Sequence, residues 1–411
     1  MNKSLIVAIF IFTHFHAFSQ DIDRLILNND FSKALQLIDS QLVKNDTQPL
    51  LYLKKGMILQ KKYDYSNALK CLEKAYQLDS SNVKILNELA EANSGLGNFR
   101  RALTYRQTIF DADTTNLVNA IGLVNCYFNL RTYREPYKIL FSAYSRDSNN
   151  LFVNKQLAFA AMRTGHDSLA IALYNKVIDQ NPSDLGNYTN LTSVFQRKEN
   201  YTKAVETLEK GITAFPDEMS LLIKLGDTHF AKRKYDHAVE CYEKYLTKGD
   251  SVYDVLKNLG LGYYYQKRTK EGLELLENCL AMKPNDPVTS LFIGLCYKDL
   301  KEYDESIAYL NFASRNALPY YLSDLYSQLG NVYSEERDFT HAVRSLKKAY
   351  SLDSTKYEIL FKIANTYDVW QKDKSQAIRY YNSYLKSPKE ENEMHRQLTE
   401  YVLERKKKLA R

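Results

Sequence analysis

Cysteine and histidine are the residues of this chain best suited to chemistry, but their spacing builds no recognisable site. The 411-residue sequence contains five cysteines, which form no C-x-x-C pair and no metal-ligand spacing: Cys71, Cys126, Cys241, Cys279 and Cys296. An odd number cannot all pair within one molecule. We therefore expect each to be a small, buried apolar side chain.

Cys279 and Cys296 leave one alternative open. Helical spacing predicts that they lie on neighbouring helices and face each other, so in an oxidising compartment they could form a disulfide. That bond would close a loop of about 16 residues and stabilise the fold by roughly 3 kcal/mol in the entropic model. Two buried thiols are the interpretation that we favour.

The histidines are explained by packing more readily than by catalysis. His229 lies on the apolar face of a predicted helix, where related segments carry tyrosine, and we expect it to be a core residue. His237 and His341 both occur in the sequence His-Ala-Val, so a repeat explains them better than a metal site does.

Enzymatic motifs are absent from the sequence. It contains no G-x-S-x-G, no H-E-x-x-H, no G-x-x-x-x-G-K and no G-x-G-x-x-G opening a helix. Its acidic residues are scattered and form no convincing catalytic pair. The sequence therefore predicts no catalytic, cofactor-binding or metal-binding residues, and no enzyme.

A recurring phrase accounts for most of the chain. The stretch Tyr303–Leu310 has close counterparts beginning at Tyr201, Tyr235 and Phe339. Its small residue, here called the marker residue, recurs every 34 residues and finally after 36 and 35. The marker residues are Ala34, Ala68, Ala102, Pro136, Ala170, Ala204, Ala238, Gly272, Ser306, Ala342 and Ala377. Such a period indicates a repeat architecture in which each unit packs on its neighbours.

A second small residue stands twelve positions before most markers and usually follows an aliphatic residue. Within one unit, Leu256, Leu259, Gly260 and Tyr263 share one face of a helix. Each unit is therefore predicted to be two amphipathic helices, a first and a second, that cross closely at their small residues.

This pattern resembles the tetratricopeptide repeat, whose signature is W-x2-L-G-x2-Y, then A-x3-F, then P. Here Leu256-x2-Leu259-Gly260-x2-Tyr263 and Pro284 match it, as does Ala238-x3-Tyr242, although the initial tryptophan is replaced throughout. The resemblance implies an all-α, right-handed superhelical solenoid of about ten to eleven repeats. It also implies a concave surface that binds extended peptides or partner helices.

Three segments follow from this reading. Residues 1–19 are expected to be a cleaved signal peptide, with Lys3, an apolar run over Leu5–Phe12 and a cleavage site ending at Ser19. Residues 20–388 form the repeats. Residues 389–411 contain a final helix, Glu393–Lys408, that we expect to cap the solenoid. The chain is thus predicted to be exported, periplasmic or secreted, with no membrane-spanning segment.

Two departures from the period lead to local predictions. Pro136 replaces the usual alanine, and Thr132 and Glu135 predict a capping box just before it. The extra residues Leu318–Tyr321 predict a longer turn between two repeats.

Each first helix carries a second stripe of residues that does not face its partner helix. Around the helix axis, this stripe lies about 100–150° from the face that packs on the second helix. We predict that this stripe binds a partner through Ile121, Asn125, Phe128, Lys155, Phe159, Met162, Arg163, Ile223, Phe230, Lys257, Leu261 and Tyr264. Asp227 and Tyr265 lie on the same stripe. The alternative is that a tight superhelix buries these side chains against neighbouring repeats. The carboxylate clamp of chaperone-binding family members does not appear in register.

The function predicted on this basis is a non-catalytic scaffold that binds a protein or peptide of unknown identity in the concave groove. The alternative is an assembly subunit of a bacterial envelope complex that uses the solenoid edge or the convex face. A formal net charge of +7, spread along the chain, does not favour nucleic acid as a partner.

Overall fold

The computed structural model describes residues 20–248, 251–371, 373–388 and 393–409, and in these residues it contains helices and turns but no strand. The chain divides into two compact units, one ending at Val194 and the other beginning at Phe195. The unit boundary falls within α11 (Leu185–Arg197).

The first unit begins with a short helix over residues 20–27. It continues with α2 (Phe31–Leu42), α3 (Pro49–Lys61), α4 (Tyr65–Leu78), α5 (Val83–Gly95), α6 (Phe99–Ala112), α7 (Leu117–Asn129), α8 (Arg134–Arg146), α9 (Leu151–Thr164) and α10 (Asp167–Gln180). The second unit holds α12 (Tyr201–Ala214), α13 (Met219–Ala231), α14 (Tyr235–Leu246), α15 (Tyr253–Tyr265), α16 (Thr269–Met282), α17 (Pro287–Asp299), α18 (Tyr303–Asn316), α19 (Pro319–Glu335), α20 (Phe339–Leu352), α21 (Glu358–Trp370), α22 (Lys374–Lys386) and α23 (Glu393–Leu409).

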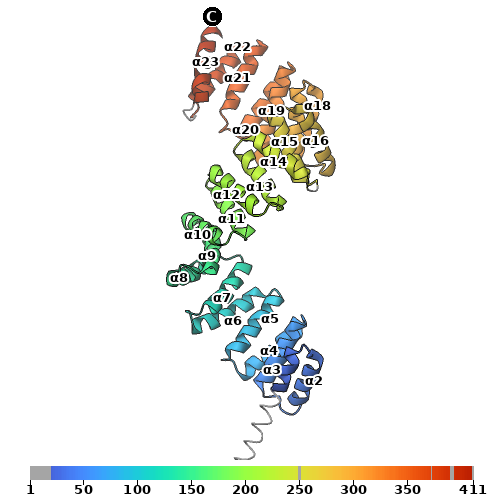
Figure 1. The fold of residues 1–411 in the computed structure, drawn as a ribbon. Helices are drawn as coiled ribbons and strands as arrows, with labels where there is room; N and C mark the ends of the chain where they lie inside the picture. Colours follow the sequence, from blue (N-terminus) through green and yellow to red (C-terminus); the bar gives the residue numbers. More distant parts are fainter. Residues whose placement is uncertain (1–19, 249–250, 372, 389–392, 410–411) are drawn as a thin grey trace, which may run out of the picture. The chain divides into compact units, whose positions relative to one another are not determined.

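Within each unit, consecutive helices pack in pairs, and each pair packs on the next (Figure 1). The first helix of a repeat pairs with the second, as α3 does with α4 and α19 with α20. All eleven marker residues are buried on the second helices, from Ala34 to Ala377. The predicted all-α solenoid of helix–turn–helix repeats is confirmed.

Glycine on the first helices permits a close crossing. A Cβ atom on Gly330 would lie 2.5 Å from Leu346 Cγ, and one on Gly294 would lie 2.9 Å from Leu310 Cγ. At the crossing of α17 and α18, Ser306 Oγ also donates a hydrogen bond to the Gly294 carbonyl at 2.7 Å. The two helices therefore approach more closely at these points than any larger residue would allow.

A left-handed residue ends each first helix. It stands five positions before the marker residue in the first ten repeats and six before it in the last. Two are glycines, Gly97 and Gly165; the others are Asn29, Tyr63, Arg131, Glu199, Arg233, Lys267, Lys301, Arg337 and Gln371. The next amide closes the helix, as where Arg268 N donates to the Tyr263 carbonyl at 2.9 Å. This is the Schellman pattern of helix termination.

Tyrosine hydroxyls tie consecutive repeats together. Tyr263 Oη donates to Glu243 Oε1 at 2.8 Å, and Tyr297 Oη donates to Glu277 Oε1 at 2.7 Å. Each bond runs from a first helix to the second helix of the preceding repeat. Burial and the Glu243 carboxylate raise the pKa of Tyr263 to about 12, so this hydroxyl remains a donor at neutral pH.

Replacing Tyr297 with Phe is expected to lower the free energy of unfolding by about 1 kcal/mol, the usual net value of one hydrogen bond. The matched control is Tyr333→Phe, because Tyr333 has the same repeat position and no hydrogen bond of its hydroxyl occurs among the described residues. Urea unfolding followed by circular dichroism measures both. Equal effects would mean that the Glu277 bond is not the cause.

The predicted Thr132–Glu135 capping box is wrong. Helix α8 begins at Arg134, its N-cap Tyr133 makes no side-chain cap bond, and Thr132 Oγ1 instead donates to the Tyr127 carbonyl at 3.1 Å. Pro136 is the third residue of α8, where the helix needs no amide donor.

The predicted long turn at Leu318–Tyr321 is also wrong. Helix α19 begins at Pro319, so the extra residues extend this helix instead of the turn. Proline suits the first position of a helix because its missing amide has no partner to lose there.

The final helix packs on the last repeat. Val402 is fully buried with Tyr381 and Tyr384, and Leu398 and Leu409 pack against the same cluster. Arg405 Nε donates to Asp368 Oδ2 at 2.7 Å and Nη2 donates to Oδ1 at 3.0 Å. Helix α23 therefore covers the apolar end that the last repeat would otherwise expose.

Candidate partner-binding surface

The two aromatic stripe residues of α7 and α9, Phe128 and Phe159, lie in one ring cluster. The ring centroids of Phe128 and Phe159 are 5.3 Å apart with an edge-to-face geometry, and Tyr133 lies 5.8 Å from Phe159. The Arg163 guanidinium lies over the Tyr133 ring at 4.5 Å, and Arg163 itself is exposed. The structure thus brings three predicted residues together, with a cation on the solvent side.

The polar and aliphatic stripe residues of the same helices are more separate. Ile121 is half-buried and Asn125 is exposed. Lys155 Nζ lies 2.5 Å from Asp184 Oδ2, so this ammonium already has a counter-ion.

A larger ring assembly, here called the aromatic cluster, spans α13 to α17 and consists of Phe230, Tyr235, Tyr264, Tyr265 and Phe292. Tyr235 and Tyr265 stack at 4.2 Å and 7°, Phe230 lies 5.2 Å from Tyr235, and Tyr264 lies 5.4 Å from Phe292. Tyr265 remains 41% exposed, so the cluster has a solvent-facing edge. Its other members are half-buried.

Two predicted groove residues are core residues instead. Met162 is 8% exposed and Leu261 is 7% exposed. Leu261 packs in one buried cluster with Leu276, Ile293 and Cys296, because the next repeat covers this side of α15. The alternative interpretation, burial against neighbouring repeats, holds for these positions.

Of the remaining stripe residues, Ile223 and Lys257 are half-buried and Asp227 is exposed. Ile223 lies on α13. Lys257 on α15 lies 3.4 Å from Asp254 and 5.2 Å from the centre of the Tyr253 ring. Asp227 accepts hydrogen bonds from Tyr242 Oη at 2.7 Å and Asn258 Nδ2 at 3.1 Å, so it holds neighbouring elements together.

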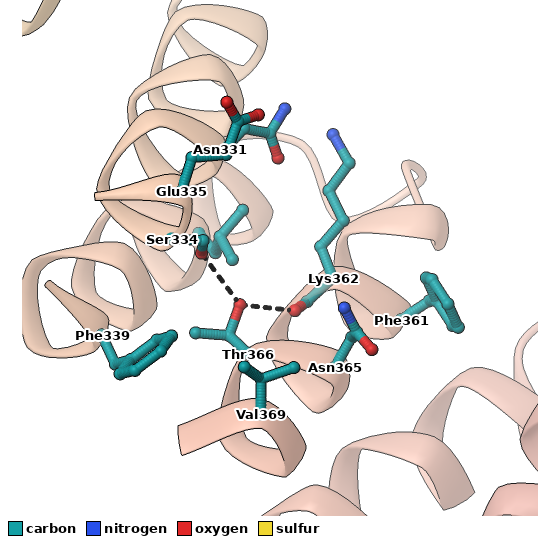
Figure 2. Close-up of a pocket in the computed structure, with 10 residues that line it drawn as sticks. Asn331, Ser334, Glu335, Phe339, Phe361, Lys362, Asn365, Thr366 and Val369 are labelled. Atoms are coloured by element: carbon teal, nitrogen blue, oxygen red, sulfur yellow. Dashed lines mark hydrogen bonds between the residues drawn. The ribbon is translucent and has the colours of Figure 1, made fainter. Parts of the chain in front are cut away.

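A cavity of about 280 Å³ opens between the first helices α19 and α21 (Figure 2). Its polar walls come from both helices and its apolar walls include α20. The lining residues are Asn331, Ser334, Glu335, Phe339, Leu346, Phe361, Lys362, Asn365, Thr366 and Val369.

Hydrogen bonds fix the floor of this cavity. Thr366 Oγ1 donates to the Lys362 carbonyl at 2.8 Å, and the hydroxyls of Ser334 and Thr366 lie 3.3 Å apart (Figure 2). Asn331 Nδ2 donates to Gln328 Oε1 at 3.2 Å. Asn331 and Asn365 follow Gly330 and Ala364 directly, so their carboxamides occupy equivalent positions one repeat apart.

Lys362 is the distinctive group of the cavity. Its ammonium donates to Ser327 Oγ at 2.8 Å, and no ion pair of the described residues includes it. Burial lowers the pKa of Lys362, against the opposing attraction of Glu358 and Asp324. Asp324 lies 2.5 Å from Lys356 Nζ, so a nearby carboxylate is already paired. Lys362 is therefore a half-buried cation that faces a space of side-chain size.

The predicted stripe ends at Tyr265 and therefore does not include this cavity. The available signal was the asparagine that directly follows the small residue of two consecutive first helices, Asn331 and Asn365, together with the intervening Lys362. The cavity itself depends on the gap between two helices, which no single repeat encodes.

Cys279 and Cys296 are free, fully buried thiols in the structure, with no disulfide between them. Burial raises the pKa of Cys279 to about 11 and that of Cys296 to about 12. Such thiols are weak nucleophiles at neutral pH.

Among the described residues, no three histidine, cysteine, aspartate or glutamate side chains are grouped so that they could hold a metal ion. None of the helices in the same part of the chain is both long and apolar enough to cross a bilayer.

Comparison with known proteins identifies the repeats. Three family models, each described as a tetratricopeptide repeat, match residues 192–252; residues 50–82, 290–313 and 323–356; and residues 358–389. No curated protein matches the chain.

Several solved structures are similar to this chain at low identity. The Cut9–Hcn1 hetero-tetramer of the APC/C is 13% identical, with 93% of this chain and 95% of that chain covered and a TM-score of 0.47. Yeast Tom70 is 14% identical, with 95% of each chain covered and a TM-score of 0.42. A tetratricopeptide repeat protein from Parabacteroides merdae is 17% identical, with 60% of this chain and 98% of that chain covered and a TM-score of 0.43.

The matched segments fall in both units and coincide with the phased helix pairs, which continue between them. The chain therefore contains tetratricopeptide repeats.

Proposed function

We propose that this chain is a non-catalytic scaffold that binds an extended segment of a partner protein on the first helices of its second unit. The observation that carries the proposal is Lys362, a half-buried cation that lines an open cavity together with two equivalent carboxamides. A half-buried ammonium that makes no direct ion pair is only partly compensated, so an acceptor group of a ligand would be stabilised there.

The cavity and the aromatic cluster would supply different contacts. Asn331 and Asn365 each offer a donor and an acceptor, which suits the amide and carbonyl of an extended main chain. The exposed edge of Tyr265 offers a rigid apolar surface of the kind that contributes strongly at interfaces. Repeats of this kind hold a preformed surface, which lowers the entropy lost on binding.

Replacing Lys362 with Met is expected to weaken binding more than tenfold, because truncating one partner of a desolvated charged contact usually costs roughly 2–5 kcal/mol. Ligands would first be selected from a random peptide library on the natural protein, and their affinities measured by fluorescence polarisation. The matched control is Lys348→Met, since Lys348 is an exposed lysine on the adjacent helix α20. Unchanged affinity in the Lys362 variant, with intact helicity, would contradict the proposal.

A second candidate, assembly through the solenoid edge, is favoured by one observation. At the start of α19, Leu318 is 57% exposed, Tyr320 is 68% exposed and Tyr321 is 40% exposed. Cross-linking to an envelope complex that survives the Lys362 change but is lost when Leu318 and Tyr320 become serine would favour this candidate.

We further propose that the chain is exported to a bacterial envelope compartment. The basis is the sequence of residues 1–19, which lie outside the described residues. A mature amino terminus at Gln20, found by terminal sequencing of the periplasmic protein, supports export; a retained Met1 opposes it.

A further inference from the structure

One repeat carries a histidine at the position from which Tyr263 and Tyr297 bond to the preceding repeat. Nine residues before the marker, four of the eleven repeats carry tyrosine, including the three that directly follow this one, whereas this repeat carries His229. The tyrosines are Tyr127, Tyr263, Tyr297 and Tyr333, with Tyr367 in the slightly longer last repeat. His229 Nδ1 is buried and makes no hydrogen bond, so the bond that Tyr263 and Tyr297 make to the preceding repeat has no counterpart at this atom.

The ring of His229 contacts a second histidine across the helix pair. The ring centroids of His229 on α13 and His237 on α14 are 5.1 Å apart, at an interplanar angle of 34°. The equivalent contact of a later repeat joins Tyr333 and His341 at 5.3 Å and 31°. The two repeats therefore share one geometry, but only one of them places two imidazole rings together, each of which can gain a positive charge.

The charged groups around His229 come from three elements. Lys232 directly follows α13, and His237 and Glu240 lie on α14. On α12, Glu209 has the repeat position at which Glu243 and Glu277 accept the tyrosine bonds. Burial, His237 and Lys232 all lower the pKa of His229, and Glu240 opposes them. The folded repeat consequently favours the neutral ring.

We propose that the His229–His237 pair makes the α13–α14 repeat acid-sensitive. As the pH falls through the range where histidine ordinarily titrates, protonation would place two cations about 5 Å apart, one of them in a half-buried site without a partner. The packing of α13 on α14 is then loosened, while the Tyr333–His341 repeat is not.

The direction follows from proton linkage. The open repeat has the ordinary histidine pKa of about 6.5 and the closed repeat has a lower one, so below that pH the open form binds more protons. The free energy needed to open the repeat is therefore highest at pH values above the ordinary histidine pKa. It decreases as the pH falls toward the folded pKa and then changes no further.

The same helix pair carries part of the aromatic cluster. Phe230 follows His229 directly, and its contact with Tyr235 bridges α13 and α14 at 5.2 Å. Loosening this pair would therefore disturb the ring edge next to Tyr265. The inference concerns the fold of one repeat and stands whether or not that edge binds a partner.

Cysteine accessibility provides the test, because Cys241 lies one turn after His237 on α14 and is 8% exposed. Cys279, in the next repeat, is a reference within the same molecule. Both buried thiols react only after local opening, when each is a solvent-exposed cysteine, so the ratio of their modification rates cancels the pH dependence of the thiolate. The full chain would be treated with 4,4′-dithiodipyridine at about pH 7.5 and about pH 5, and modification at each site measured by mass spectrometry.

The modification ratio of Cys241 to Cys279 is expected to rise about threefold or more on acidification, since each unit of pKa difference can change an opening constant about tenfold. His229→Tyr, which introduces the residue that the next two repeats carry as Tyr263 and Tyr297, should abolish the rise. A flat ratio in the natural chain, or an undiminished rise in this variant, would overturn the proposal.

His237→Gln provides a second arm, because His237 is exposed and its replacement disturbs no core packing. It removes one of the two charges and should reduce the rise. An unchanged rise in a His237→Gln protein of normal helicity would also overturn the proposed pair, even if the His229 variant did not fold.

Discussion

Replacing Arg405 with Met is expected to destabilise the last repeat and its capping helix by about 2–4 kcal/mol. Asp368 is only 5% exposed, and its carboxylate accepts two hydrogen bonds from Arg405 and one from Tyr381 Oη at 3.2 Å. Removing the guanidinium leaves a buried carboxylate with a single hydroxyl donor. We place the loss below the largest values for buried pairs because the Arg405 side chain is 38% exposed.

Hydrogen exchange of peptides from α21 to α23, measured by mass spectrometry, reports this loss locally. The matched control is Arg396→Met on the same helix, since its ion pair with Glu393 has both side chains at least 70% exposed. Exposed pairs of this kind contribute about 0–1 kcal/mol. Adding Asp368→Asn to the Arg405 variant should recover part of the loss. Equal exchange in the two arginine variants would show that the Asp368 contact does not hold the cap.

Replacing Gly330 with Val is expected to destabilise the protein by about 3 kcal/mol, at the upper end of the usual overpacking range. Even a Cβ would lie 2.5 Å from Leu346 Cγ and 3.2 Å from the Ala342 carbonyl oxygen. Leu346 is 1% exposed and cannot swing into solvent. The better helix propensity of valine offsets only a few tenths of a kcal/mol.

A double-mutant cycle separates this clash from a general loss of packing. Leu346→Ala alone creates a cavity, and Gly330→Ala alone creates a contact; combined, the two should destabilise less than the sum of their separate effects. Urea unfolding measures the four free energies. A strictly additive result would show that Gly330 and Leu346 do not share the space between α19 and α20.

The repeat architecture could be predicted because it depends on local spacing. A marker residue such as Ala342 meets the small residue twelve positions earlier, Gly330, whatever the rest of the chain does. Each helix pair is therefore specified by a few residues that lie close together in the sequence. Tyrosine at the Tyr297 position could be assigned to a helical face, but its partner Glu277 belongs to another repeat.

The two local errors have a common physical cause. Leu318–Tyr321 and Thr132 were interpreted from motifs that are compatible with more than one backbone path. Proline begins a helix as readily as it ends one, and a threonine hydroxyl can bond backward to Tyr127 instead of forward into α8. Tertiary packing decides between such paths.

The surface was predicted least well, because exposure depends on what the next repeat covers. Phe128 and Phe159 meet as their shared stripe suggests, yet Leu261 on the corresponding stripe is buried by its neighbour. The Lys362 cavity is harder still. The space depends on how α19 and α21 pack. Its character depends on Lys362, whose ammonium forms no ion pair with a described carboxylate.

The left-handed residues that end the first helices are positions at which substitution by glycine could stabilise the fold. Nine of these eleven positions hold a residue other than glycine, from Asn29 to Gln371. Each such residue is held in a conformation that disfavours side chains by roughly 1 kcal/mol. Contributions from successive repeats add approximately.

None of the eleven left-handed residues lines the cavity or belongs to the aromatic cluster, although Lys267 Nζ lies 5.6 Å from the centre of the Tyr264 ring. Substitutions at these turns, in evolution or by engineering, could therefore change the free energy of unfolding by several kcal/mol. The residues that face a partner would stay unchanged. In such a chain, thermodynamic stability and the choice of binding partner can change independently of each other.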